Sequence, residues 1–206
     1  MAEVYVSNHP LVQHKLTALR DVNASHREFR ELVKELAMLL TYEITRDLTM
    51  TDKAVTTPMG RAEGKKVKEI GLVPILRAGL GMTEGVIALM PQVQVWHIGL
   101  YRDEETLRPV EYYNKLPNDP TVEACVVLDP MLATGGSAVA TINILKNWGV
   151  PTIKFMGLIA APEGIQKLSE AHPDVDIHVA TIDSHLNERG FIIPGLGDAG
   201  DRMFGT

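Results

Sequence analysis

The sequence predicts an α/β fold in which a central parallel sheet is covered by helices on both faces. From residue 67 onward, apolar runs of strand length alternate with segments of helical periodicity. This alternation is typical of parallel sheets whose crossovers are helices. The chain has 206 residues, of which 45% are hydrophobic, so it is long enough to bury one sizeable core. We therefore expect a single domain that spans residues 1–206.

Two helices are expected before the alternating region. Pro10 follows His9 at the start of the first apolar pattern, and proline is favoured at the first helical position because no N–H is needed there. Ser25 and Glu28 are three residues apart, which is the spacing of a capping box. Apolar residues then recur at helical spacing over residues 29–44. This second helix is predicted to be scaffold.

Residues 49–68 are predicted to form an extended arm or hairpin. This segment is polar and contains Pro58, Gly60 and Gly64, which interrupt helices. Its basic side chains could meet an anionic effector or a partner subunit, but a solvated loop is the simpler interpretation. These basic residues are Arg61, Lys65, Lys66 and Lys68.

In the alternating region, charged residues follow four of the predicted strands. Strands are expected at residues 70–76, 93–101, 125–128, 152–159 and 175–182. Helices are expected at 80–90 and 162–172, and a further helix follows the strand at 125–128 and ends at about residue 147. Parallel sheets bind ligands at the carboxyl ends of their strands, so the charged residues at these ends are candidates for one site. The charged and aromatic segment 104–120 is predicted to be a mobile hairpin or lid. The four charged residues are Arg77, Arg102, Asp129 and Asp183.

The stretch from Cys125 to Ala138 indicates function most strongly. Its apolar strand ends on Asp129, and a turn with Pro130 leads through a run of small and hydroxyl residues at 133–137 into a helix. Backbone N–H groups and the positive end of the helix dipole converge at such a turn, and glycines let the backbone approach an anion. The stretch lacks the lysine of a P-loop and the glycine spacing of a dinucleotide fold. It is therefore predicted to be a phosphate-binding loop of another kind.

The C-terminal stretch, residues 187–206, is predicted to be neither a helix nor an ordinary strand. It is rich in glycine, yet it also carries Phe191, Ile192, Leu196 and Met203. Apolar anchors among glycines suggest an ordered loop that presents its backbone to a ligand. The alternative is a tail that packs against the core or a neighbouring subunit.

Charge and cysteine content exclude several classes of protein. The formal net charge of −6 disfavours nucleic acid or an anionic membrane as the main partner. No apolar run approaches the ~18 residues of a membrane span, and no signal peptide is expected. The one cysteine, Cys125, lies in a predicted buried strand, so we expect no disulfide framework and a cytoplasmic location. The seven histidines are scattered, which disfavours a zinc enzyme.

Four motifs together resemble the uracil phosphoribosyltransferases, a family with the type I phosphoribosyltransferase fold. The motifs are ILRAG at 75–79, LYRD at 100–103, LDPMLATGGS at 128–137 and IPGLGDAGDR at 193–202. The last two are highly specific, and the similarity covers essentially the whole chain. Type I enzymes usually carry two adjacent acids where this chain has Asp129 and Pro130, and the acid-proline pair is the form found in this family.

The resemblance implies that uracil and 5-phosphoribosyl 1-diphosphate (PRPP) react to UMP and diphosphate, with Mg²⁺ as cofactor. It implies that a C-terminal hood binds the base, that residues 77–79 bind the diphosphate and that residues 133–137 bind the 5′-phosphate. The implied catalytic residues are Asp129, Arg102 and Asp198. The residues expected to bind PRPP are Arg77, Ala78, Gly79, Arg102, Asp129, Pro130, Met131, Leu132, Ala133, Thr134, Gly135, Gly136, Ser137 and Asp198. Those expected to bind uracil are Ile192, Gly197, Asp198 and Ala199.

Other implications concern the metal and the partners. Mg²⁺ is expected to be held mainly by PRPP and water, near Asp198, which is also a candidate for handling the uracil N1 proton. The resemblance implies a homo-oligomer, a dimer or higher, that uses the N-terminal helices and the arm, and it makes GTP a candidate effector.

Two alternative functions stay open. A phosphoribosyltransferase for another base would share the phosphate loop and would differ in the C-terminal stretch. An RNA-binding pyrimidine regulator could have the same fold, although the net charge of −6 and the lack of a long basic stripe count against it.

Overall fold

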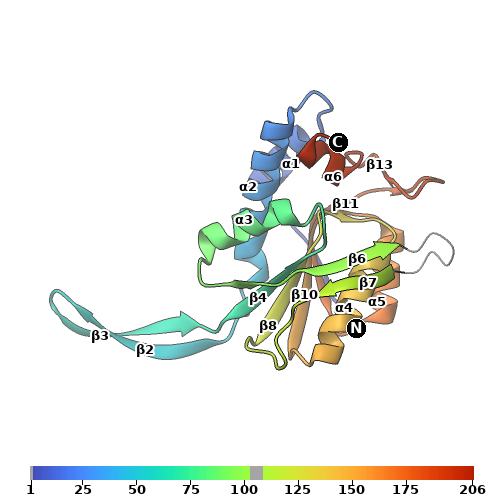
Figure 1. Ribbon diagram of the computed structural model, residues 1–206. Coiled ribbons are helices and arrows are strands. Elements are labelled where there is room, and N and C mark those ends of the chain that lie inside the picture. Colours follow the sequence, from blue (N-terminus) through green and yellow to red (C-terminus); the bar gives the residue numbers. More distant parts are fainter. Residues whose placement is uncertain (1, 103–108) are drawn as a thin grey trace.

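The protein is built around a seven-stranded sheet whose strands all pair in parallel (Figure 1). The structure is a computed structural model and describes residues 2–102 and 109–206. The strand order is β1-β11-β10-β8-β4-β5, and β9 pairs with β10 beyond the end of β8. The bounds are β1 Val4–Val6, β4 Ile70–Pro74, β5 Gln94–Val95, β8 Ala124–Leu128, β9 Met131–Leu132, β10 Thr152–Ala160 and β11 Asp176–Ile182.

Helices cover both faces of this sheet, as the alternating pattern predicts. Leu72 and Val126 point to one face and belong to the cluster that includes α1, α2 and α3. Their neighbours Val73 and Val127 point to the other face and pack with α4 and α5. Burial on both faces explains why these strands read as continuous apolar runs. The helices are α1 Pro10–Arg20, α2 His26–Ile44, α3 Leu80–Leu89, α4 Gly136–Trp148 and α5 Pro162–Ala171.

The two N-terminal helices begin where the sequence predicts. Pro10 is the first residue of α1. Ser25 caps α2 through the full capping box, since its side chain accepts from the backbone N–H of Glu28 and the Glu28 carboxylate accepts from the N–H of Ser25. Within the described residues, no helix combines the length and the apolar character needed to cross a membrane.

The predicted arm is an antiparallel hairpin that extends far from the sheet (Figure 1). It consists of β2 Met50–Thr57 and β3 Gly60–Val67. Nearly every residue of it is exposed, and Met59 at its tip is 96% exposed.

The predicted strand at 93–101 is wrong in its extent, and so is the placement of Arg102 at the edge of the central sheet. Only two residues, β5, pair regularly in that sheet. Ile98 makes one further parallel bridge to Ile75, and β6 Ile98–Arg102 then pairs antiparallel with β7 Pro109–Asn114. Gly99 permits this hairpin, because a Cβ there would lie 2.5 Å from the Tyr112 ring. Of the predicted lid at 104–120, residues 103–108 lie outside the described residues.

The C-terminal stretch contains regular structure, which corrects the prediction that it would be neither helix nor strand. Two short strands, β12 His185–Leu186 and β13 Ile192–Ile193, pair antiparallel. A short helix follows, α6 Ala199–Phe204, and Asp198 caps it by accepting from the N–H of Asp201 at 2.9 Å. We call residues 184–206 the hood. It lies at the ends of β11 and α1 in Figure 1.

Candidate active site

The phosphate loop connects β8 to α4 and leaves the start of that helix open. Gly135 occupies the N-cap position with φ of +74°, and no side chain caps the helix. A Cβ on Gly135 would also lie 3.0 Å from the carbonyl oxygen of Gly164 in α5, so this position needs glycine on two counts. The hydroxyl-bearing residues Thr134 and Ser137 are exposed. The loop can therefore offer backbone N–H groups, hydroxyls and the positive end of a helix to an anion.

Asp129 lies between β8 and β9 at the carboxyl edge of the sheet. Its carboxylate accepts a hydrogen bond from the N–H of Met131 at 3.2 Å. Burial raises the pKa of Asp129 to about 7, and the hydrogen bond from Met131 opposes this increase. Such a carboxylate is poorly solvated without a ligand, so hydroxyl donors or a cation would stabilise its ionised form.

A cavity of about 210 Å³ brings the phosphate loop and the hood together. The nearest lining residues of the two segments, Ala133 and Gly190, are 57 positions apart in the chain, and Ala78 from the turn after β4 lines a third side. All four residues predicted to bind uracil line the cavity, and so do five of the residues predicted to bind PRPP. Its lining residues are Ala78, Asp129, Met131, Ala133, Gly190, Phe191, Ile192, Gly197, Asp198, Ala199 and Gly200.

The turn after β4 packs directly against the end of β8. A Cβ on Gly79 would lie 2.3 Å from the carbonyl oxygen of Leu128, so only glycine allows this approach. The Leu76–Arg77 peptide bond is cis. The Arg77 side chain turns toward α6, where its Nη2 lies 3.1 Å from Oδ1 of Asp201.

Asp183 follows β11 as predicted, but it holds the hood instead of facing the cavity. Its two carboxylate oxygens accept from Nη1 and Nη2 of Arg20 at 2.7 and 2.6 Å, and Oδ2 also accepts from the N–H of Gly195 at 2.8 Å. Asp183 is buried, at 9% exposed. A buried carboxylate that is paired in this way is a structural anchor, which corrects its place among the candidate ligands.

Arg102 ends β6, and its side chain lies outside the part that the structure describes. Its role in binding PRPP stays a prediction. Cys125 is buried in β8, and burial raises the pKa of its thiol to about 12, so the thiol is unreactive at neutral pH.

Two residues that the sequence patterns did not point to hold the hood in place: Arg202 within it and Glu163 in α5. The Arg202 guanidinium donates to the carbonyl oxygens of Leu19 and Leu196 at 2.9 and 3.0 Å and lies 4.5 Å from the centre of the Phe29 ring. Glu163 accepts from the N–H of Leu186 at 2.9 Å. Arg202 is the last residue of the motif at 193–202, so the motif could have indicated its importance. No pattern in the sequence indicated Glu163.

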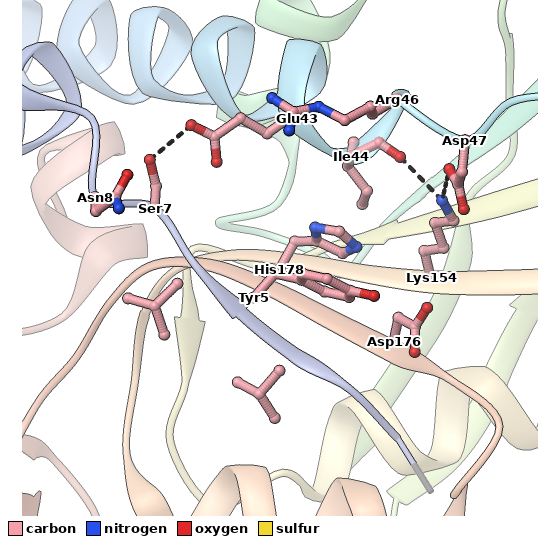
Figure 2. Close-up of a pocket in the computed structure, with 12 residues that line it drawn as sticks. Tyr5, Ser7, Asn8, Glu43, Ile44, Arg46, Asp47, Lys154, Asp176 and His178 are labelled. Atoms are coloured by element: carbon pink, nitrogen blue, oxygen red, sulfur yellow. Dashed lines mark hydrogen bonds and ion pairs between the residues drawn. The ribbon is translucent and has the colours of Figure 1, made fainter.

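A larger cavity, about 510 Å³, lies between β1, the end of α2 and the first residues of β10 and β11 (Figure 2). Two contacts join polar groups that line it. Ser7 donates to Glu43 at 2.7 Å, and Lys154 contacts Asp47. His178 is neutral, because burial and the nearby Lys154 charge lower its pKa to about 4. Lys154 and Asp176 mark the amino ends of their strands, whereas parallel sheets bind ligands at the carboxyl ends, so the smaller cavity is the candidate active site.

Within residues 2–102 and 109–206, no three histidine, cysteine, aspartate or glutamate side chains group together as a metal site. Asp129 and Asp198 nevertheless both line the smaller cavity. Carboxylate oxygens are the ligands that Mg²⁺ prefers, and Mg²⁺ commonly keeps several waters and uses substrate phosphates as further ligands. The residues present therefore fit an ion that arrives with a phosphorylated substrate.

Comparison with known proteins gives consistent matches over the whole chain. The family model described as "Uracil phosphoribosyltransferase" matches residues 6–206. The uracil phosphoribosyltransferases of Roseiflexus castenholzii and Halalkalibacterium halodurans are each 60% identical to the chain, over 207 and 208 residues, with 100% of both chains covered. The AQ2163 protein from Aquifex aeolicus has a solved structure that superimposes with a TM-score of 0.92 at 38% identity, covering 98% of this chain and 97% of that chain.

A more distant structure shows the same fold. Adenine phosphoribosyltransferase from Leishmania donovani superimposes with a TM-score of 0.57 at 11% identity, covering 91% of this chain and 86% of that chain. The parallel sheet with helices on both faces is thus the type I phosphoribosyltransferase fold that the sequence predicts.

Proposed function

The chain belongs to the uracil phosphoribosyltransferase family, and on that premise we propose that it joins uracil to the phosphoribosyl group of PRPP, releasing diphosphate and making UMP for pyrimidine salvage. One observation carries the proposal: the phosphate loop after β8 and the hood after β11 line the same cavity. A sugar phosphate held by the first segment would present its anomeric carbon to a base held by the second.

The 5′-phosphate of PRPP binds at the start of α4 in this proposal. Gly135 and Gly136 keep the backbone free of side chains there, and the exposed Thr134 and Ser137 supply hydroxyl donors. Asp129 lies at the base of the same loop and accepts hydrogen bonds from the ribose hydroxyls. Its negative charge, placed in a poorly solvated site, also stabilises the positive charge that develops on the sugar as the bond to diphosphate breaks.

The leaving diphosphate carries negative charge, and guanidinium groups suit it because they bind phosphate oxygens bidentately. Arg77 and Arg102 are assigned this role, together with the backbone of residues 77–79. When bound with PRPP, Mg²⁺ would neutralise part of the diphosphate charge, and Asp129 and Asp198 are the residues placed to hold it.

Uracil recognition is assigned to the backbone of the hood. Uracil offers an acceptor, a donor and an acceptor along its O2, N3–H and O4 edge. Gly197 has φ of +84° and open space where a Cβ would stand, so its peptide groups are accessible to a ligand. Cytosine reverses two of these groups and would leave buried partners unpaired, which can discriminate by ~10⁴. Buried Ile192 supplies an apolar wall, and Asp198 is assigned to the uracil N1 proton.

The direct test measures diphosphate release from PRPP and Mg²⁺ with uracil, cytosine, adenine, hypoxanthine or no base. We expect turnover with uracil alone. Turnover with another base would retain the phosphate-loop assignment and overturn the assignment of Ile192 and residues 197–199. No turnover with any base would contradict the proposed enzyme.

Three further properties complete the proposal. The exposed arm supports a homo-oligomer of chains that each act as one domain over residues 1–206, and light scattering coupled to gel filtration measures the subunit number. GTP is proposed as an effector, and a change in the PRPP dependence of the rate on adding GTP would support it. The place of action is proposed to be the cytoplasm.

A further inference from the structure

A charged contact joins the hood to the turn that follows β4. Nη2 of Arg77 lies 3.1 Å from Oδ1 of Asp201, and its Nη1 lies 3.4 Å from Oγ1 of Thr206. Thr206 also donates to Oδ1 of Asp201 at 3.0 Å. The guanidinium carbon of Arg77 is 6.0 Å from the centre of the Phe204 ring. The Arg77 side chain is therefore held by three residues at the C-terminus.

This contact holds the Arg77 side chain beside the cavity. Ala78, the next residue, lines the cavity, whereas the guanidinium of Arg77 is turned toward α6. Both partners are accessible to solvent, with side chains 57% exposed for Arg77 and 49% for Asp201. Ion pairs with this exposure are weak and are screened by salt. A ligand with several negative charges can therefore displace the carboxylate from the guanidinium.

We propose that Asp201 is an internal competitor for Arg77: its carboxylate occupies the guanidinium when the site is empty, and the diphosphate group of PRPP or of the product displaces it. This inference rests on the proposed function, in which Arg77 binds diphosphate. Asp201 is a positioning residue in this scheme, because it acts on the reaction through Arg77. Each time diphosphate leaves, the carboxylate takes its place, so the departing product does not leave an unpaired guanidinium behind.

The contact also couples the two halves of the site. The N–H of Asp201 donates to Asp198 at 2.9 Å, and Asp198 lines the cavity. A Cβ on Gly200, one of the two residues between them, would lie 3.2 Å from Oδ1 of Asp198 and 3.7 Å from Nη2 of Arg77. Asp198, which is assigned to the base, and Arg77, which is assigned to diphosphate, therefore both contact the first turn of α6. Asp201 lies in that turn and contacts both residues.

The sign of the effect distinguishes competition from simple support of the hood. Asp201→Asn keeps the shape of the side chain and removes its charge. If the carboxylate competes, the variant binds diphosphate about 2- to 5-fold more tightly, the range that matches an exposed ion pair, and its KM for PRPP falls without a rise in kcat. If Asp201 only holds Arg77 in a productive place, the variant binds diphosphate more weakly.

The experiment is isothermal titration calorimetry of the full chain with magnesium diphosphate, for the wild type, Asp201→Asn, Arg77→Gln and the double variant. We expect tighter binding in Asp201→Asn, weaker binding in Arg77→Gln, and no further effect of Asp201→Asn once Arg77 is replaced. Asp174→Asn is the matched control, because it removes another exposed carboxylate, paired with Lys146 away from the cavity, and its affinity should equal that of the wild type.

Other outcomes overturn the inference in distinguishable ways. Unchanged or weaker binding in Asp201→Asn, with Arg77→Gln still weakened, refutes the competition and leaves the proposed function intact. Unchanged binding in Arg77→Gln refutes the diphosphate role of Arg77 and the competition with it. Thr206→Val removes the hydroxyl that contacts both partners and should tighten binding in the same direction but less, so the inference stays testable if Asp201→Asn folds poorly.

Discussion

Adding one methyl group at Gly79 would test whether the turn after β4 must pack against β8 for PRPP to bind. In the present structure, a Cβ on Gly79 would lie 2.3 Å from the carbonyl oxygen of Leu128 and 2.7 Å from that of Ile75. Real Cβ contacts do not fall below 3.0 Å, so the turn must move by at least 0.7 Å, the difference between 3.0 and 2.3 Å. Overpacking of this kind costs about 1–3 kcal/mol, and a displacement near 1 Å at a binding site can cost ~10²-fold in rate.

The matched control is Gly85→Ala, which creates an equally close contact away from the cavity. A Cβ on Gly85 would lie 2.2 Å from the carbonyl oxygen of Lys34, where α3 packs on α2. Both variants should unfold at lower temperature, by roughly 2–4 °C for each kcal/mol lost. Only Gly79→Ala should lose about 10²-fold in kcat/KM for PRPP, measured by diphosphate release well below the unfolding transition.

The result that would refute this reasoning is a destabilised Gly79→Ala enzyme that keeps the wild-type KM for PRPP. The displaced turn would then have no part in binding the diphosphate. An equal loss of PRPP affinity in Gly85→Ala would show instead that any disturbance of α3 impairs the site, and the argument from the position of the turn would fail.

Three other predictions use different parts of the molecule. The pKa of Asp129 is raised from 3.8 to about 7, so the ligand-free protein should lose stability as pH rises between these values. Thermal unfolding measured across this pH range should show the loss in the wild type and not in Asp129→Asn; the same dependence on pH in both proteins would contradict the prediction. Asp183→Ala leaves the Arg20 guanidinium without its buried partner and should lower the free energy of unfolding by about 3–5 kcal/mol and raise KM for uracil; denaturant titration and kinetics check both. Cys125, buried with a pKa raised to about 12, should resist iodoacetamide until the chain unfolds, and rapid labelling of the native protein would show that β8 opens.

The phosphate loop could be predicted from the sequence because the residues that form it are consecutive in the chain. A strand, an acid, a glycine-rich turn and a helix start follow one another within the stretch from Cys125 to Ala138, and each member needs only its neighbours to form. The structure places these elements at the predicted residues, with β8 ending at Leu128 and α4 beginning at Gly136. The capping box of Ser25 and Glu28 was predictable for the same reason.

The hood was predicted less well because long-range contacts decide its conformation. Its helix α6 has six residues and includes a glycine, so local propensity gives it little support. Arg202 and Met203 hold it in place, the first by donating to the carbonyl oxygens of Leu19 in α1 and of Leu196 within the hood, and the second by burial in the core. A local sequence pattern cannot show that residues elsewhere in the fold will contact and stabilise such a short helix.

The role of Asp183 illustrates the same limit at a single residue. Its position after an apolar strand made it equivalent, in the sequence, to Asp129. The structure separates them, because Arg20 reaches Asp183 from α1 at 2.6 Å while Asp129 remains open to the cavity. The two aspartates differ only in which distant groups the fold brings to them.

By itself, the sequence determined the alternation of strands and helices in the central sheet, the phosphate loop and the family, since these depend on residue spacing along the chain. Tertiary structure alone decided that the hood and the loop share one cavity, that Asp183 is an anchor, that β6 leaves the central sheet and that Asp201 holds Arg77. Each of these depends on two segments far apart in the chain meeting in space. Their distances follow from the packing of the helices on the sheet, which no local pattern encodes.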